Sequence, residues 1–175
     1  MKTVIVLAMH GAPPNDFPKR ELGEFFGLHS RLEHAAGSDA AQIKPRHDEL
    51  DAKIRAWART AQNDPYWAGS REIANELARE MKCEVIIGFN EFCAPTLAAA
   101  FDQAAERAAR VIVLTPMMTR GGEHSEKEIP HAIDAARQRH PAITFQYVWP
   151  LDTVAIAQFL ANQITNYERF ARITN

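Results

Sequence analysis

TVIVLAM (residues 3–9) is an unbroken run of apolar and β-branched side chains, followed at once by His10 and Gly11. Strands that are buried on both faces have this composition, whereas half-exposed strands alternate apolar and polar residues. The run is too short to cross a membrane, and no small-residue cleavage site follows it, so we expect neither a membrane span nor a signal peptide. It predicts a central strand of a parallel sheet.

Three later segments carry the same kind of strand signal, with helical periodicity between them. Strands are expected at residues 84–89, 110–116 and 143–148, and helices at 70–81, 95–109, 127–139 and 154–164. Ile73, Leu77 and Met81 illustrate the four-residue spacing of the helices, and Pro95 suits a first helical turn. The alternation predicts an α/β fold with three layers: a mainly parallel four-stranded sheet with helices on both faces.

Residues 12–68 interrupt this alternation and carry no strand signal of their own. The spacing of their apolar side chains predicts two helices, at 18–36 and 45–61, separated by a turn at 37–41. We expect a single domain over residues 1–175, with this helical insertion placed over the ends of the strands. The pair of helices could contact a substrate or could only enlarge the core.

Composition and missing motifs exclude several classes of function. The net charge is −2 and no basic block exceeds two residues, so we expect no nucleic-acid partner. Phosphate-binding GxxxxGK[ST] and GxGxxG motifs and the GxSxG nucleophile motif are absent. Cys83 and Cys93 are spaced neither as a CxxC site nor as a disulfide framework, which favours reduced, buried thiols and a cytoplasmic protein.

Three residues with metal-binding side chains follow the ends of predicted strands. His10 ends the first strand, Glu91 lies two residues after the second, and His124 lies in the loop after the third. Ligands of a parallel sheet bind outside the carboxyl ends of its strands, so these side chains should meet. Two imidazoles and a carboxylate suit a first-row divalent ion and leave coordination positions open. Taken singly, each residue could equally be structural.

The loop that carries His124 contains further candidates. Gly121 and Gly122 permit unusual backbone angles or the close approach of a ligand. Ser125 is expected to cap the following helix, with Glu128 as its partner three residues later in a capping box. This cap would hold His124 rigidly at the start of a helix.

Other residues near the strand ends could bind the body of a ligand. Arg120 is a candidate partner for a carboxylate, because a guanidinium matches that group, or it is a solvated loop charge. Met117 and Phe89 could belong to an apolar wall around a ligand or to the ordinary core. The same two interpretations apply to Met118, Phe92 and Trp67.

These segments, in this order, resemble the class II chelatases, specifically the small CbiX/SirB type. The matching pieces are residues 9–11, 63–67, 88–92, 95–97, 111–116, 122–124, 128–130 and 148–151. The resemblance implies an open α/β chelatase fold and insertion of cobalt or iron into sirohydrochlorin. It also implies that the chain pairs as a homodimer, with the tetrapyrrole in a cleft between two halves.

The resemblance implies that His10, Glu91 and His124 are both the metal-binding and the catalytic residues. A divalent metal (Co²⁺, Ni²⁺ or Fe²⁺) and the tetrapyrrole would be substrates, with no organic cofactor. A histidine would take a pyrrole proton, since imidazole exchanges protons near neutral pH. Arg120, Met117, Phe89 and Gly122 would contact the macrocycle.

Two departures from the family pattern leave the identity of the tetrapyrrole substrate undecided. The family has His-Gly-Ser-Arg where this chain has His10-Gly11-Ala12-Pro13, and short members lack the insertion at 12–68. The related ferrochelatases carry a helical extension at the corresponding place. A non-catalytic tetrapyrrole- or metal-binding protein and a metal-assisted hydrolase are the alternatives to a chelatase.

Overall fold

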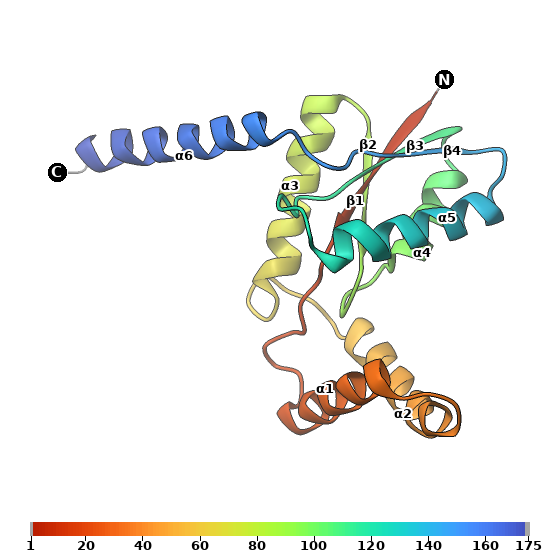
Figure 1. Cartoon of the computed structure of the whole chain (residues 1–175). Helices are drawn as coiled ribbons and strands as arrows, with labels where there is room; N and C mark the ends of the chain where they lie inside the picture. The colour runs from red at the N-terminus through yellow and green to blue at the C-terminus, as the bar shows by residue number, and fades with distance from the viewer. Residues whose placement is uncertain (1, 174–175) are drawn as a thin grey trace.

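The computed structural model describes residues 2–173 and contains a four-stranded parallel sheet in the order β2-β1-β3-β4 (Figure 1). The strands are β1 (Thr3–Met9), β2 (Glu84–Phe89), β3 (Arg110–Leu114) and β4 (Thr144–Tyr147). β1 lies inside the sheet, and its residues from Val4 to Met9 are at most 4% exposed. The predicted central strand and the predicted parallel sheet are therefore confirmed.

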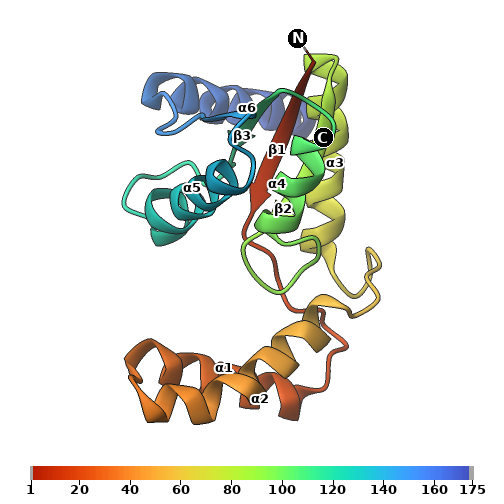
Figure 2. The same ribbon diagram turned by 90° about the vertical axis from the view of Figure 1, so that its right-hand side faces the viewer.

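Helices cover both faces of this sheet (Figure 2). α3 (Pro65–Met81) covers one face, and α4 (Leu97–Ala105) and α5 (Ile129–Arg139) cover the other. The remaining helical elements within residues 2–173 are α1 (Lys19–His34), α2 (Ser38–Arg55), the π-helical turn η1 (His124–Glu128) and α6 (Thr153–Ile173). Val4 and Val6 of β1 belong to a core shared with α4 and α5, whereas Leu7 and Met9 pack with α3. The predicted three layers are thus confirmed, because alternate side chains of one buried strand supply two cores.

Two predicted helix limits are wrong because of prolines. Pro95 was expected in the first turn of α4, but its carbonyl accepts a bond from Phe89 N (2.9 Å). That contact keeps residue 95 extended beside β2, and α4 starts after Thr96, whose hydroxyl accepts a bond from Ala99 N (3.2 Å). In the insertion, α2 begins at Ser38 and runs through Pro45. The helix-forming residues before Pro45 extend α2 upstream although proline removes one hydrogen bond.

The inserted helices α1 and α2 lie beyond the carboxyl end of β1 (Figures 1 and 2). They enclose a small core of their own, formed by Phe17, Phe25, Leu50 and Ile54. Phe92, from the loop between β2 and α4, joins this core and is 6% exposed. The insertion is therefore packed against the segment that follows β2.

A buried ion pair also fastens the insertion to the sheet. The side chains of Arg59 and Asp64 are 6% and 1% exposed and are in direct contact. Arg59 donates to the carbonyls of Ala12 (2.7 Å) and Phe92 (2.6 Å), while Asp64 accepts a bond from Trp67 N (2.8 Å) at the start of α3. One pair thus connects the loop after β1, the loop after β2 and α3.

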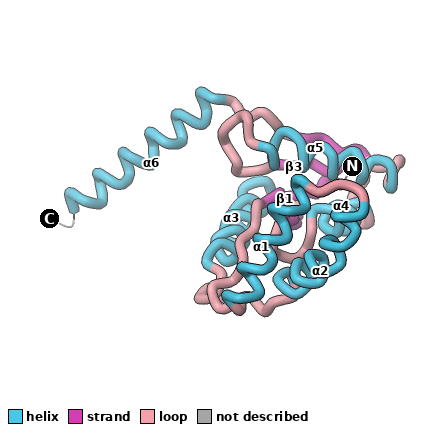
Figure 3. The backbone as a smooth tube through the Cα atoms, turned by 60° about the horizontal axis from the view of Figure 1, so that its bottom comes forward, coloured by secondary structure: helices cyan, strands magenta, loops and turns pink. Residues whose placement is uncertain are grey.

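The last helix, α6, extends away from the rest of the molecule (Figures 1 and 3). It runs well beyond residue 164, where helical periodicity predicted its end. Several of its apolar side chains are exposed, among them Phe159 (48%), Leu160 (50%) and Ile164 (63%). None of the helices within residues 2–173 is both long and apolar enough to cross a membrane.

Replacing Arg59 by Met should lower the free energy of unfolding by about 3–5 kcal/mol, because the carboxylate of Asp64 would stay buried without its partner. Urea denaturation measures this change. Arg79→Met is the control, since Arg79 pairs with Glu76 on the surface and such pairs contribute at most about 1 kcal/mol. Equal losses of unfolding free energy in the two variants would contradict the stabilising role given to the buried pair of Arg59 and Asp64.

Candidate metal centre

The structure brings His10, Glu91 and His124 together at the carboxyl edge of the sheet. One ligand atom from each residue lies within 4.8 Å of the other two, and all three residues are partly buried. His10 Nε2 is 3.8 Å from a carboxylate oxygen of Glu91, and the two imidazole rings meet edge to face at 4.5 Å. Nitrogen ligands of one tetrahedral ion are roughly 3.3 Å apart, so small side-chain rotations would bring all three onto one ion.

Backbone pairing sets the separation of His10 and Glu91. The ladder between β1 and β2 continues past both strands, through bonds from Asn90 N to Met9 O (2.9 Å) and from Glu91 N to His10 O (2.8 Å). Gly11 has φ +102°, and a Cβ at this position would lie 2.0 Å from the carbonyl oxygen of Glu91. Only glycine allows the two loops to approach so closely.

The ring of His10 is held by its own backbone. Its Nδ1 lies 2.7 Å from the carbonyl oxygen of Gly11. A carbonyl only accepts, so Nδ1 carries the proton and Nε2 keeps its lone pair on the side of Glu91 and His124. The backbone N–H of His10 donates to the hydroxyl of Tyr66 (3.2 Å), which attaches this residue to α3.

His124 is held by a carboxylate instead. Its Nδ1 lies 2.8 Å from Glu128 Oε2, which also accepts a bond from Asn90 Nδ2 at 3.1 Å. Nε2 of His124 is therefore the nitrogen available to a metal, and an imidazole backed by a carboxylate is a common arrangement around metals. Both residues belong to η1, and π-helical turns are frequent at functional sites.

The predicted capping box of Ser125 and Glu128 is wrong. Glu128 bonds the ring of His124, and the buried hydroxyl of Ser125 donates to the carbonyl of Gly122 (3.2 Å). The carbonyl of Ser125 accepts a bond from the hydroxyl of Tyr147 (2.9 Å). Burial raises the pKa of Tyr147 to about 12, so this donor keeps its proton over the physiological range. Tertiary contacts, and no cap, hold η1 in place.

The residues predicted to contact a macrocycle are dispersed around the site. The side chain of Arg120 is 75% exposed and lies 3.5 Å from Glu126. A backbone hydrogen bond from Gly121, with a smaller contribution from Arg120, lowers the pKa of Glu126. Gly122 lies in the loop before His124 and accepts the bond from Ser125, and Met117 packs partly against the core.

Phe89, the last residue of β2, is buried in the core. It is 1% exposed and packs with Leu7 and Met9 under α3, so its ring is not available to a ligand at the strand ends. Phe92 is buried in the core of the insertion. Trp67 is partly buried against the core that contains Leu7 and Met9, and the guanidinium of Arg71 lies 4.7 Å from the centre of the Trp67 ring. Alternation along β2 turns residue 89 inward although it is the last residue of the strand.

A cavity of about 670 Å³ opens beside Glu91 and His124, two of the three candidate residues. Its lining consists of imidazoles and carboxylates: His29, His34, Glu91, Glu123, His124 and Glu128. The insertion supplies His29 and His34, which the sequence did not indicate, because no motif relates them to the strand ends. A lining of this composition attracts cations.

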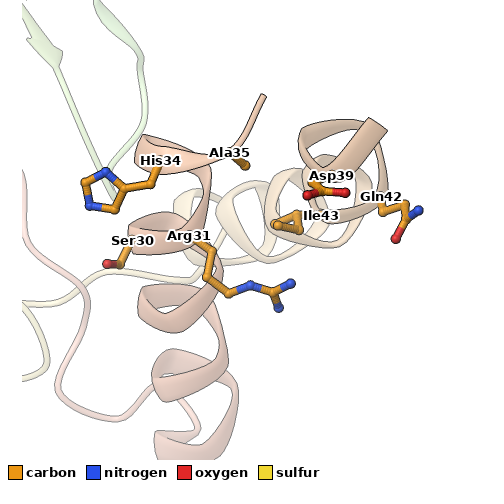
Figure 4. Close-up of a pocket in the computed structure, with 7 residues that line it drawn as sticks. All are labelled: Ser30, Arg31, His34, Ala35, Asp39, Gln42 and Ile43. Atoms are coloured by element: carbon orange, nitrogen blue, oxygen red, sulfur yellow. The ribbon is translucent and has the colours of Figure 1, made fainter. Parts of the chain in front are cut away.

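A second cavity, of about 500 Å³, lies between α1 and α2 (Figure 4). Ser30, Arg31 and Asp39 are among its lining residues, and it contains none of the three metal-binding candidates. His34 borders both cavities, and in Figure 4 its ring points away from Asp39 and Gln42. The first cavity is therefore the candidate site.

Two arginines of the insertion hold the loop that carries Glu91. Arg55 donates to the carbonyls of Cys93 (2.9 Å) and Asn90 (3.0 Å), and Arg59 donates to that of Phe92. Loop carbonyls near a site need partners when they are removed from water. These arginines had no signal in the sequence, because an arginine in a helix usually lies on the solvated face.

Comparison with known proteins identifies relatives of the chain. The model of the CbiX family matches residues 62–167. A sirohydrochlorin cobaltochelatase of Priestia megaterium is 28% identical over 83 residues, which are 46% of this chain and 27% of that protein. The chain therefore spans about a quarter of the length of the curated relative that it matches.

Two solved structures are similar to this chain, and one of them, a CbiX protein, shares its fold. The CbiX protein of Marinobacter aquaeolei VT8 superposes with a TM-score of 0.50 and 14% identity, over 97% of this chain and 98% of that one. The sirohydrochlorin chelatase SirB of Bacillus subtilis subspecies spizizenii, in complex with cobalt, gives a TM-score of 0.42 and 17% identity, over 84% of this chain and 42% of that one.

Gly11→Ala should lower the free energy of unfolding by about 2–4 kcal/mol, through the positive φ and the contact with the Glu91 carbonyl. Chemical denaturation measures this loss, and a titration with Co²⁺ should show weaker binding as Glu91 moves away from His10. The control is Gly23→Ala in α1, where no atom lies within 4 Å of the added Cβ. That change should stabilise the helix by about 0.5–1 kcal/mol. Unimpaired stability and binding in Gly11→Ala would contradict the role given to this glycine.

Proposed function

Because the chain belongs to the CbiX family, we propose that it is a metal chelatase that inserts a divalent ion into a sirohydrochlorin-type tetrapyrrole. The convergence of His10, Glu91 and His124 at one edge of the sheet carries this proposal. Three protein ligands hold an ion and leave positions open, which the ring nitrogens of a macrocycle need in order to replace the protein ligands one by one.

The proposed reaction exchanges one divalent ion for two pyrrole protons. The ion leaves Nε2 of His10, Nε2 of His124 and the carboxylate of Glu91, and forms bonds to the four ring nitrogens. The three bonds that break free three lone pairs, and two of these, those of the imidazoles, accept the two pyrrole protons, since imidazole takes up protons near neutral pH. The contacts of His10 with the Gly11 carbonyl and of His124 with Glu128 hold both rings through the exchange.

Cobalt is the metal we propose, with Ni²⁺ and Fe²⁺ as the next candidates. Two nitrogens and one carboxylate accept several first-row ions, so the donor set supports the class of ion. The name of the Priestia megaterium relative favours cobalt within that class.

Arg120, Met117 and Gly122 are proposed to contact the macrocycle. Arg120 would pair with a carboxylate of the substrate in place of Glu126. Free thiols at Cys83 and Cys93 accord with a cytoplasmic location.

The double variant His10→Ala/His124→Ala should lose at least about 100-fold in kcat/KM for metal insertion, because it lacks two ligands and both proton acceptors. The assay is anaerobic and follows the absorbance change of sirohydrochlorin with Co²⁺, Ni²⁺ or Fe²⁺, with protoporphyrin as the alternative macrocycle. His131→Ala, on the exposed surface of α5, is the control. Insertion at the wild-type rate by the double variant would refute the site. An absorbance change that stops at one equivalent in the wild type would indicate a binding protein instead.

We further propose that the chain forms a homodimer through α6. Leu160, Ile164 and Tyr167 recur at helical spacing and are 50%, 63% and 75% exposed, so they form an apolar stripe. An isolated helix gains little stability in water, and most helices depend on packing of such a stripe. A second copy of the chain supplies that packing reciprocally, since each α6 projects from its own sheet (Figure 3).

Leu160→Glu/Ile164→Glu should weaken self-association by about 100-fold, because two charges would enter the apolar interface. Sedimentation velocity over a concentration series measures the dissociation constant. Asn162→Glu is the control, since residue 162 lies on the opposite side of the helix from the stripe. A wild-type chain that sediments as a monomer throughout the series would overturn the proposed dimer.

A further inference from the structure

Two histidines of the insertion face each other outside the metal centre. Nδ1 of His29, in α1, lies 3.1 Å from Nε2 of His47, in α2. The other ring nitrogen of His47 lies 3.2 Å from Asp48 Oδ1, which accepts its proton. Nε2 of His47 therefore accepts a hydrogen bond from Nδ1–H of His29. A metal ion can replace this bond when the proton of His29 moves from Nδ1 to Nε2 of the same ring, which leaves a lone pair on each of the two facing nitrogens.

The separation of the two nitrogens suits ligands of one ion. Nitrogens that are each roughly 2.0–2.1 Å from an ion and about 3.1 Å apart subtend an angle of about 100° at it, between the octahedral and tetrahedral values. The ring of Phe25 stacks on both imidazoles, at 4.9 Å from His47 and 5.7 Å from His29. The rings are thus held side by side before an ion arrives, which lowers the entropic cost of binding.

One histidine of the pair, His29, lines the cavity at the strand ends, which also borders Glu91 and His124 of the metal centre. His29 lines that cavity of about 670 Å³ together with Glu91 and His124, and His34 and Glu123 line it as well. An ion that leaves His29 therefore enters a cavity lined by carboxylates and imidazoles, which supply oxygen and nitrogen ligands for a divalent metal.

We infer that His29 and His47 form a loading site that binds the divalent metal first and delivers it to His10, Glu91 and His124. The binding step rests on residues of the insertion alone, and the delivery step rests on the proposed chelatase function. Two protein ligands hold an ion less firmly than three, so transfer to the metal centre is favourable. In the transfer the bonds to His29 and His47 break and bonds to the three residues of the centre form. The proton of His29 returns from Nε2 to Nδ1, which restores the hydrogen bond to His47.

The binding step is tested with Co²⁺ alone, by calorimetry and visible absorption on the full chain. We expect two Co²⁺ sites of unequal affinity in the wild type. H10A/H124A should keep the weaker site, H29A/H47A should keep the tighter one, and the variant with all four changes should lose both. Identical isotherms for H10A/H124A and the fourfold variant would overturn the loading site.

Two controls separate loss of ligands from loss of folding. H29Q/H47Q keeps hydrogen-bonding side chains of similar size but removes the imidazoles, and it should lose the weaker site with an unchanged circular dichroism spectrum. His131→Ala removes an exposed histidine of α5 outside the cavity and should retain both sites. Retention of the weaker site in H29Q/H47Q, as in the His131→Ala control, would also overturn the inference.

The delivery step is tested by insertion kinetics at varied Co²⁺ concentration. H29Q/H47Q should raise the KM for Co²⁺ by about tenfold and leave kcat unchanged, because saturating metal bypasses the loading site. An unchanged KM in an active enzyme would overturn delivery. A wild type that binds two Co²⁺ but inserts none would refute the proposed function, while the loss of the weaker site in H29A/H47A would still support metal binding by the pair.

Discussion

The carbonyl oxygen of Glu91 occupies the space that any side chain at residue 11 would need. This approach is possible because the hydrogen bonds between β1 and β2 continue beyond the strands, to the pair formed by Glu91 N and His10 O. The separation of His10 and Glu91, two of the proposed metal ligands, therefore follows from strand pairing and one glycine. Every other part of the site is arranged around this junction.

The inserted helices stabilise the same junction from the other side. The loop after β2 turns sharply, with Phe92 at φ +57°, and carbonyls at its start and end would lack partners without the insertion. Arg55 and Arg59 satisfy them, and Phe92 enters the apolar core of α1 and α2. The insertion thus contributes to the rigidity of Glu91 in addition to covering the strand ends, and its contact with a substrate stays a prediction.

Local patterns predicted most of the fold, because burial on both faces gives a strand an unmistakable composition. The limits of β1 and β2 agree with the structure, and the rule that ligands meet at the carboxyl ends of parallel strands brought His10, Glu91 and His124 together. Glu128 was assigned to a helix cap because sequence spacing reports only neighbours along the chain. Its partners, the ring of His124 and the amide of Asn90, are set by the π-helical turn and by packing between two loops. Contacts between loops of this kind produce no periodic pattern in the amino-acid sequence.

The carboxylates around the two histidines explain how a partly buried site could release its metal. Glu91 and Glu128 place two negative charges beside Nε2 and Nδ1 of these rings. A divalent ion balances them, and removal of the ion alone would leave both charges without that compensation, at a cost that falls mainly on Glu91, whose side chain is only 26% exposed. In the proposed reaction two pyrrole protons arrive as the ion departs, so the net charge of the site is the same before and after transfer. The coupling of proton and metal movement therefore follows from the charge of the site. An insertion reaction keeps that charge constant, whereas simple dissociation of the ion does not.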